Sequence, residues 1–418
     1  MNLLVITNKI GLMKKDLIER PYYTEKIRPH IGKPIIKILT GQRRIGKSYI
    51  LLQLMDIIKK ADSSAQIIYI SKELKEFSRI QTDTELYQHI ASELVEDKKN
   101  YVFIDEIQEI SEFQHSLRSL LAEGKCDIYC TGSNANMLSG ELATHLAGRY
   151  LEFPVHALSY REFLHFHQLP DSNETLQKYM RVGGMPYLIH LNGDEQLCFE
   201  YLQNLYSTIL LKDVIARRQV RNIDFMERLV GYIADNVGSL FSSSNIAKYL
   251  KSQRQQVPTQ LVIEYSLALT QAYFIHKVPR IDIQGLKIFE IGEKYYFEDL
   301  GIRNAIRGIN PLTKIQKWME NLVYMQLLRE GFKVYVGKTD QLEIDFVGQR
   351  LQERIYVQVC FRMEGENTRQ REVASLQKTG DNFPKYIVTL DEYALGVTAE
   401  GIAVVHLREF LLRDLQNS

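Results

Sequence analysis

The stretch GQRRIGKS, residues 41–48, lies between two segments of different periodicity. The apolar run 35–39 before it has the length of a buried strand, and 49–60 after it has the spacing of an amphipathic helix. Two glycines followed by a lysine and a hydroxyl residue match the phosphate-binding loop pattern in the context that the pattern requires. A chance glycine-rich turn is the alternative, but these flanks favour a loop that binds a nucleoside triphosphate.

The loop positions have separate predicted tasks. Glycines let the backbone turn so that its N–H groups point at the phosphates, and the following helix adds its positive N-terminal end. Lys47 is expected to reach the β- and γ-phosphates, and the Ser48 hydroxyl to bind Mg²⁺. The predicted nucleotide-binding residues are Gly41, Gln42, Arg43, Arg44, Ile45, Gly46, Lys47, Ser48 and Tyr49.

A second apolar run, 101–104, ends in the carboxylates Asp105 and Glu106. On a strand next to the loop strand, Asp105 would reach the Mg²⁺ ion and Glu106 would orient or deprotonate the attacking water. A core strand followed by a solvated acidic turn is the alternative. The presence of a phosphate loop in the same series of strands and helices favours the catalytic interpretation.

A third run, 127–131, ends in Gly132-Ser133-Asn134. Because ligands of open α/β sheets lie at the carboxyl ends of the strands, Ser133 or Asn134 is expected to contact the γ-phosphate or the water. A turn or a helix N-cap would use the same residues. Three arginines are candidates for stabilising transition-state charge, although each also fits a plain surface position: Arg43, Arg44 and Arg149.

Periodicity divides the chain further. Strand-like and helical segments alternate up to about residue 153, which is typical of a parallel sheet. Helical segments follow, beginning with Ser159 and Glu162 at the spacing of a capping box, and later helices followed by a hairpin with a turn at Gly285 indicate a winged helix. The predicted domains are a nucleotide-binding core (1–157), a helical lid (158–222), a winged helix (223–308) and a separate α/β domain with its own core (309–418).

Composition excludes several classes of protein. The 418 residues contain 52 basic and 51 acidic side chains, so no strong overall field indicates nucleic acid or a membrane surface. No apolar run approaches the length that crosses a bilayer, and the start of the chain does not read as a secretory signal. The four cysteines lack the spacing of a zinc site or a disulfide framework. We expect a cytoplasmic protein with reduced thiols.

The chain resembles a widespread prokaryotic family of AAA-type ATPases with a C-terminal domain of unknown function similar to restriction endonucleases. The motifs that carry the resemblance extend over nearly the whole length: GQRRIGKS (41–48), FIDEI (103–107), TGSN (131–134), GRY (148–150), LSYREF (158–163), GGMP (183–186), KYYFEDLGIR (294–303) and EIDF (343–346). The resemblance implies ATP as the nucleotide, a core of the additional-strand type with a catalytic glutamate, a winged helix and a nuclease-like fold.

The nuclease-like fold normally holds a metal with an aspartate, then a glutamate on the next strand and a lysine two residues further. Here a helix offers Glu320 and a strand offers Asp345, but Gln358 and Cys360 take the places of the glutamate and the lysine. An amide is a weaker ligand for a hard cation than a carboxylate, and a thiol cannot replace an ammonium. We therefore expect a broken metal site and no DNA cleavage.

Basic residues leave duplex DNA and a protein open as partners, since winged helices bind either. The candidates are Lys248, Lys251, Arg254, Lys277, Arg280 and Lys287 in the predicted winged helix and Lys212, Arg217, Arg218 and Arg221 before it. One hypothesis is an oligomeric ATPase that acts on nucleic acid, in which an arginine completes the neighbour's site. The other is a slowly hydrolysing switch that acts on a protein partner.

Overall fold

The computed structural model describes residues 17–135, 146, 148–216, 220, 222–252, 257–283, 285, 292–309, 311–339, 342–363 and 366–415. The chain forms two compact units: Met1–His156 with Gln271–Tyr273, and Ala157–Thr270 with Phe274–Ser418. The finer divisions expected at 222/223 and 308/309 stay predictions. Among the described helices, none combines the length and the apolarity that crossing a bilayer requires.

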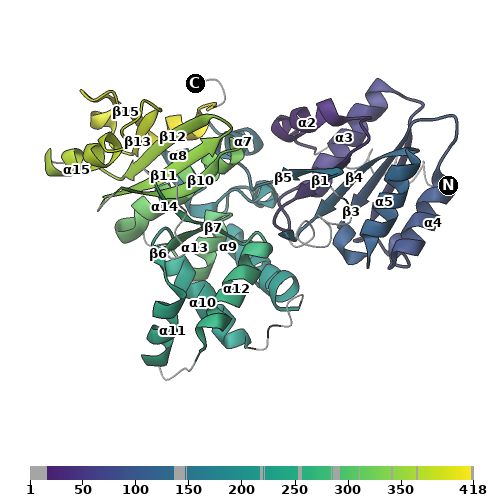
Figure 1. Cartoon of the computed structure of the whole chain (residues 1–418), viewed down its shortest axis with the longest axis horizontal. Helices are drawn as coiled ribbons and strands as arrows, with labels where there is room; N and C mark the ends of the chain where they lie inside the picture. Colours follow the sequence, from purple (N-terminus) through teal and green to yellow (C-terminus); the bar gives the residue numbers. More distant parts are fainter. Residues whose placement is uncertain are drawn as a thin grey trace. The chain divides into compact units, whose positions relative to one another are not determined.

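The first unit contains a five-stranded parallel sheet in the order β2-β3-β4-β1-β5 (Figure 1). Its strands are β1 (Ile36–Thr40), β2 (Gln66–Ser71), β3 (Asn100–Asp105), β4 (Cys126–Gly132) and β5 (Tyr150–Pro154). Its helices are α2 (Pro21–Ile27), α3 (Lys47–Ala61), α4 (Asp83–Glu93) and α5 (Phe113–Glu123). The strands expected at 35–39, 101–104 and 127–131 each lie within two residues of these bounds.

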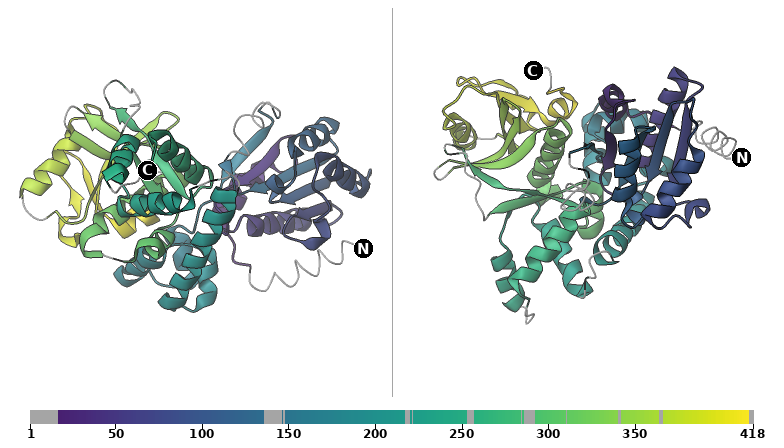
Figure 2. Two further views of the ribbon diagram at one scale, coloured as in Figure 1. Left: turned by 90° about the horizontal axis from the view of Figure 1, so that it is seen from below. Right: turned by 45° about the vertical axis from the view of Figure 1, so that its right-hand side comes forward.

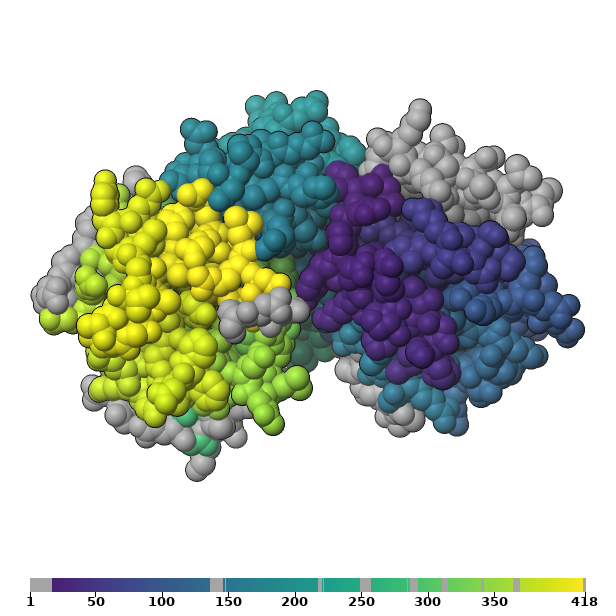
Figure 3. All heavy atoms as spheres, turned by 90° about the horizontal axis from the view of Figure 1, so that it is seen from above, coloured from purple at the N-terminus to yellow at the C-terminus, as the bar shows by residue number. Residues whose placement is uncertain are grey.

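Helices cover both faces of this sheet, with α3 on one and α4 and α5 on the other (Figure 1). Leu86 and Ile90 of α4 and Leu117 and Leu120 of α5 are buried in one core with the strands. Because both faces are covered, the strands read as continuous apolar runs rather than alternating ones. Helix α2 lies on the surface of this unit, in purple in Figure 3.

The second unit begins with helices α7 (Tyr160–His167), α8 (Asn173–Val182) and α9 (Glu195–Thr208). Helix α9 continues into a π-helical segment, Ile209–Ala216. Ser159 caps α7 as predicted: its hydroxyl accepts from the Glu162 N–H at 3.2 Å, and Glu162 Oε2 accepts from the Ser159 N–H at 2.9 Å. Next come α10 (Ile223–Asp235), α11 (Ser243–Ser252), α12 (Thr259–Gln271) and α13 (Leu300–Arg307). The expected helical segments are therefore present.

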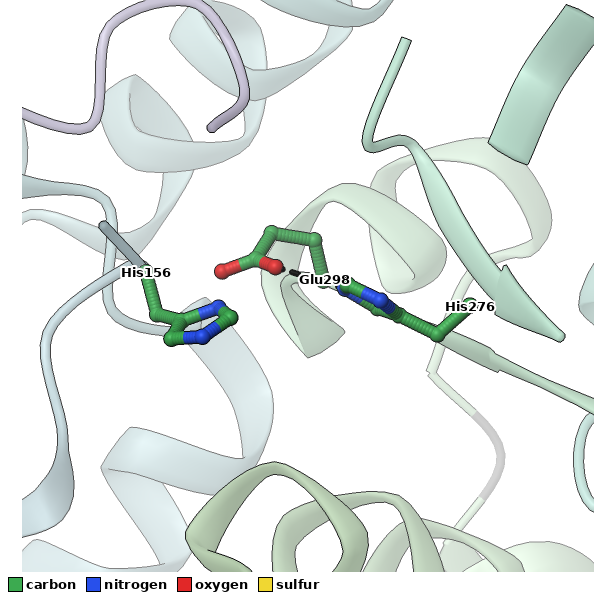
Figure 4. Close-up of side chains that lie close together, drawn as sticks. All are labelled: His156, His276 and Glu298. Atoms are coloured by element: carbon green, nitrogen blue, oxygen red, sulfur yellow. Dashed lines mark hydrogen bonds and ion pairs between the residues drawn. The ribbon is translucent and has the colours of Figure 1, made fainter. Parts of the chain in front are cut away.

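A three-stranded antiparallel sheet in the order β6-β9-β7 accompanies these helices. Its strands are β6 (Leu240–Phe241), β7 (Ile275–Val278) and β9 (Glu293–Phe297). Strands β7 and β9 pair as the predicted hairpin requires, and His276 Nε2 on β7 lies 2.7 Å from Glu298 Oε2 just after β9 (Figure 4). Residues 286–291, between the two arms, lie outside the described part of the chain.

The last sheet, whose strands are drawn mainly in green to yellow in Figure 2, has seven strands in the order β14-β15-β13-β12-β11-β10-β8. They are β8 (Arg280–Asp282), β10 (Lys333–Thr339), β11 (Leu342–Arg350), β12 (Glu353–Cys360), β13 (Lys385–Thr389), β14 (Gly396–Val397) and β15 (Ala403–His406), with helices α14 (Pro311–Arg329), α15 (Glu366–Gln377) and α16 (Leu407–Leu412). Strand β8 lies in the stretch of the predicted hairpin and pairs with β10 in this sheet, while the boundary expected at 308/309 stays a prediction.

Two of the quoted motifs meet inside the second unit. Asp299, in KYYFEDLGIR, accepts from the Gly184 N–H of GGMP at 2.6 Å and from the Ile302 N–H at 3.0 Å. A Cβ on Gly301 would lie 2.0 Å from the Val182 carbonyl oxygen, and one on Gly184 would lie 2.4 Å from a carbonyl oxygen of Leu158. Close packing of α13 against the end of α8 therefore accounts for Gly301, and close packing against Leu158 accounts for Gly184.

Candidate nucleotide-binding site

The predicted phosphate loop joins the end of β1 to the start of α3. Gly41 and Gly46 have φ angles of 138° and 93°, which favour glycine, and Arg44 also has a positive φ of 68°. A Cβ on Gly41 would lie 2.2 Å from the carbonyl oxygen of Val155, so no larger residue fits there without a shift of the backbone. The first glycine of the motif is therefore required both by conformation and by space.

Lys47 begins α3 and is 4% exposed. Its Nζ donates to the carbonyl oxygens of Gly41 and Gln42, each at 2.9 Å. The ammonium is thus held inside the curve of the loop, beside the positive end of α3. This arrangement concentrates positive charge where the sequence predicts the β- and γ-phosphates.

Ser48 and Asp105, the two predicted Mg²⁺ ligands, are in contact. The Ser48 hydroxyl donates to Asp105 Oδ1 at 3.0 Å. The expectation that the strand of Asp105 lies next to the loop strand β1 is wrong, because β3 pairs with β2 and β4, and β4 separates it from β1. Asp105 still reaches Ser48, because the parallel strands end at one edge of the sheet.

Thr131, at the end of the intervening β4, connects the two carboxylate residues. Its hydroxyl donates to Asp105 Oδ1 at 2.6 Å and accepts from the backbone N–H of Glu106 at 2.9 Å. Glu106 has a φ of 57°, which turns the chain sharply after β3. One side chain thus fixes both the ligand carboxylate and the backbone that presents the predicted base.

Glu106 is 7% exposed, and its carboxylate is hydrogen-bonded. Ser133 donates to its Oε2 at 3.2 Å, and Gln108 Nε2 donates to the same oxygen. Ser133 is therefore the predicted β4 residue that the structure brings to Glu106. Asn134 follows it, half-buried, at the same edge of the sheet.

The pKa values of the two carboxylates are shifted in opposite directions. Burial is the largest influence on each, and it raises the pKa of Asp105 above its usual range despite hydrogen bonds from Thr131 and Ser48. Burial also pulls the pKa of Glu106 upward, but the charges of Lys47 and Arg43 and the hydrogen bonds from Gln108 and Ser133 hold it below its ordinary value. Glu106 is therefore ionised at neutral pH, as a proton acceptor must be.

The remaining loop residues differ in exposure. Arg43 is half-buried, Ile45 is buried, and Arg44 and Tyr49 are exposed. Gln42 is 1% exposed, and neither polar atom of its side chain has a hydrogen-bond partner among the described residues. Arg43 is thus the loop arginine whose charge acts on Glu106.

Arg149 lies at the opposite end of the sheet. Its carbonyl oxygen accepts from Ile36 N–H at 3.0 Å, at the start of β1, whereas the loop follows Thr40 at the end of that strand. Four residues of strand span about 13 Å. Arg149 therefore lies away from the loop of its own chain, and its expected role in stabilising transition-state charge stays a prediction.

Three residues that hold the site were not predicted from the sequence. Thr131 and Gln108 are described above, and Arg20 supports the loop from the segment before α2. Arg20 donates to the carbonyl oxygen of Ile45 at 2.8 Å and to that of His156 at 2.9 Å. Thr131 stands in the quoted TGSN motif, which is a usable signal, but nothing near Arg20 in the sequence indicates its role.

Most of the basic residues predicted to contact DNA have side chains outside the described part of the chain. Lys212 and Lys248 are exposed, and Lys277 lies 3.4 Å from Glu293 on the neighbouring strand. Arg217, Arg218, Arg221, Arg254 and Lys287, and the side chain of Lys251, lie outside the described part of the chain. DNA binding through these residues stays a prediction.

Comparison with known proteins defines the relatives of the chain. An uncharacterized protein of Haemophilus influenzae is 33% identical over 408 residues, covering 96% of this chain and 100% of that protein. This chain belongs to the same family. An uncharacterized protein of Methanocaldococcus jannaschii is 28% identical over 392 residues, covering 90% of this chain and 84% of that protein.

Two domain families match parts of the chain. A model described as an AAA domain matches residues 33–164, and a domain of unknown function (DUF8612) matches residues 173–313. The first match covers the loop and its acidic partner, so this family carries an AAA-type nucleotide-binding domain. Neither match extends beyond residue 313, and the nuclease-like identity of the last domain stays a prediction.

Solved structures are similar only at a distance. RuvB of Thermotoga maritima is 14% identical with a TM-score of 0.33, covering 63% of this chain and 91% of that chain. The Aeropyrum pernix ORC1 protein, solved in complex with DNA, is 12% identical with a TM-score of 0.29, covering 70% and 91%. Neither likeness is close enough to indicate a function for this family.

Proposed function

We propose that this protein binds ATP together with Mg²⁺ and hydrolyses it. The observation that carries the proposal is the contact between Ser48 Oγ and Asp105 Oδ1 at 3.0 Å, at the sheet edge that also holds Lys47 and Glu106. Residues 57 positions apart in the sequence meet there, in the combination that a triphosphate with its metal requires. The AAA-type domain match supports the same function.

The residues fit the metal. Ser48 and Asp105 supply a hydroxyl and a carboxylate, and Mg²⁺ prefers such hard oxygen ligands. When bound, Mg²⁺ neutralises charge on the β- and γ-phosphate oxygens. Lys47 adds a second positive charge, and the loop N–H groups donate hydrogen bonds to the phosphates.

Glu106 is the proposed general base. A water oxygen attacks the γ-phosphorus, the bond to the β–γ bridging oxygen breaks, and Glu106 accepts the proton that the water loses. ADP and inorganic phosphate are the products. The hydrogen bonds from Ser133 and Gln108 fix the carboxylate, so little reorganisation is needed when the water arrives.

Glu106→Gln tests this assignment. The variant keeps the phosphate loop, so calorimetry with Mg²⁺ should give an ATP affinity within about threefold of wild type, while turnover should fall by about 10² or more. Lys47→Ala should lose affinity itself. Glu109→Gln provides a matched control, because it removes an exposed carboxylate from the same segment.

Absence of ATP uptake in the presence of Mg²⁺ would refute the proposal, and so would a Glu106→Gln variant that turns over normally. Parallel titration with GTP tests the choice of base, which rests on the family resemblance alone.

We further propose that nucleotide state is coupled to a nucleic acid or protein that binds the second unit.

A second copy of the chain is a separate candidate partner. The exposed Arg149 lies away from the loop of its own chain, so a contribution from it to ATP hydrolysis requires a second copy, as in oligomeric ATPases. DNA-stimulated turnover, ATP-dependent oligomers and a loss of turnover in Arg149→Ala would support an ATPase that acts on nucleic acid. Slow turnover by a monomer, unaffected by duplex DNA, would favour the switch that acts on a protein.

A further inference from the structure

A buried ammonium lies among carboxylates in the second unit. Lys294, on β9, is 2% exposed. Its Nζ lies 2.7 Å from Glu343 Oε1 and 3.6 Å from Asp345 Oδ1, both on β11. Since a buried lysine is stable as a cation only with compensating charge, this placement depends on the β11 carboxylates.

Glu320 of α14 adds a third carboxylate and is fully buried, and this burial raises its pKa to about 7. Its carboxylate accepts from the Tyr296 hydroxyl at 3.2 Å and from Lys317 Nζ at 3.0 Å. The negative charges of Asp345, Glu320 and Glu343 all act on the Lys294 ammonium. The two acidic residues that the sequence predicted for the lost metal site, Glu320 and Asp345, thus surround a lysine.

The other groups around Asp345 already have partners within the chain. Asp345 Oδ2 accepts from the Val359 N–H at 2.9 Å, and the Asp345 N–H donates to Gln358 Oε1 at 3.1 Å. Cys360 donates to the carbonyl oxygen of Arg362 at 3.0 Å. Gln358 and Cys360, which replace the usual glutamate and lysine, therefore both form hydrogen bonds within the chain.

These residues do not fit the divalent ion that the nuclease resemblance implies. An ion bound by Asp345 would stand close to Lys294 Nζ, where two cations in a buried site repel strongly. We propose that the Lys294 ammonium takes the place of the metal ion, so that the last domain is a metal-free relative of nucleases with a built-in cation. The inference does not depend on ATP binding.

The ammonium also joins two sheets. Lys294 comes from β9 of the three-stranded sheet, whereas Glu343 and Asp345 come from β11 of the seven-stranded sheet. A metal ion taken up from solution would bind the carboxylates of β11 in the seven-stranded sheet and would have no covalent connection to β9. A lysine therefore links the two sheets permanently, in a way that does not depend on the supply of metal.

Terbium luminescence tests the proposal. Tb³⁺ binds carboxylates and is excited by a nearby tyrosine, here Tyr296 beside Glu320. The measurement uses the full chain without nucleotide and with Ser48→Ala, which removes a ligand of the other predicted metal site. The Lys294 proposal requires no saturable signal from this protein, and a gain of at least about tenfold in Tb³⁺ affinity in Lys294→Ala.

The controls separate this site from other carboxylates. Adding Asp345→Asn to Lys294→Ala should abolish the new signal, and Lys277→Ala, which removes a half-exposed lysine from the adjacent β7, should give none. Saturable Tb³⁺ binding that is present with Lys294 in place and lost in Asp345→Asn would overturn the proposal. So would folded Lys294→Ala and Lys294→Gln proteins that gain no affinity. The arm with Lys294 intact tests the idea even if neither variant folds.

Discussion

Replacement of Thr131 by valine removes one hydroxyl without changing the shape of the side chain. That hydroxyl donates to Asp105 Oδ1 at 2.6 Å and accepts from the Glu106 N–H at 2.9 Å. Both bonds are buried, since Thr131 is 0% exposed. The change therefore leaves a buried carboxylate short of one hydrogen bond and a buried N–H without its acceptor.

The expected cost follows from these two losses. A hydrogen bond to a charged group contributes about 1.5–3 kcal/mol, and an unsatisfied buried N–H costs about 1–3 kcal/mol. Partial relaxation at the end of β4 reduces the sum, so we expect Thr131→Val to lower the free energy of unfolding by about 3 kcal/mol. Displacement of Glu106 should also lower turnover by at least about tenfold.

Urea unfolding without nucleotide and steady-state ATP hydrolysis measure the two effects. Thr131→Ser is the matched control, because it keeps the hydroxyl and loses a methyl group, so turnover should stay within about threefold of wild type. A Thr131→Val protein with wild-type stability and turnover would refute the role of this hydroxyl as the link between Asp105 and Glu106.

Two further predictions concern the same sheet edge. Gly41→Ala should abolish ATP binding in calorimetry, because its Cβ would lie 2.2 Å from the Val155 carbonyl oxygen, whereas Gly124→Ala, also at positive φ but with nothing within 4 Å, should only lower stability by about 1 kcal/mol. Asp105→Asn should raise the free energy of unfolding of the nucleotide-free protein at pH 8. Because the pKa of Asp105 is raised in the folded state, its stabilising contribution is present below its unfolded pKa and is lost as pH rises through the folded pKa. Urea unfolding across pH should show that the stability gained in Asp105→Asn, relative to wild type, becomes smaller in acid. A stability difference that grows in acid would contradict a raised pKa of Asp105.

Local sequence is enough to predict the phosphate loop and the ends of the strands. The loop needs particular residues at fixed spacing, and the apolar runs around it carry their own periodicity, so Gly41, Lys47 and Ser48 could be assigned without a fold. Asp105 could be assigned through its strand end. The order of the strands could not be read from those residues, and the expected adjacency of β3 and β1 was therefore wrong.

Residues whose role depends on long-range pairing were missed or misplaced. Thr131 reaches Asp105 only because β4 lies between β1 and β3. The register of β5 on β1 sets Arg149 at the wrong end of the sheet for its own loop. Lys294 lies in a quoted motif, but its carboxylate partners are 49 and 51 positions later, on a strand of another sheet. Spacing along the chain carries no information about such contacts.

The short connection between β7 and β8 has a mechanical consequence. Pro279 alone separates Val278, the last residue of β7 in the three-stranded sheet, from Arg280, the first residue of β8, which pairs with β10. A proline with its restricted φ leaves no slack for a hinge between the two layers. A force applied to either sheet is therefore transmitted directly to the other. A fragment that ends near residue 308 would lack β10, the strand that pairs with β8, and would expose an unpaired strand edge that is prone to aggregation.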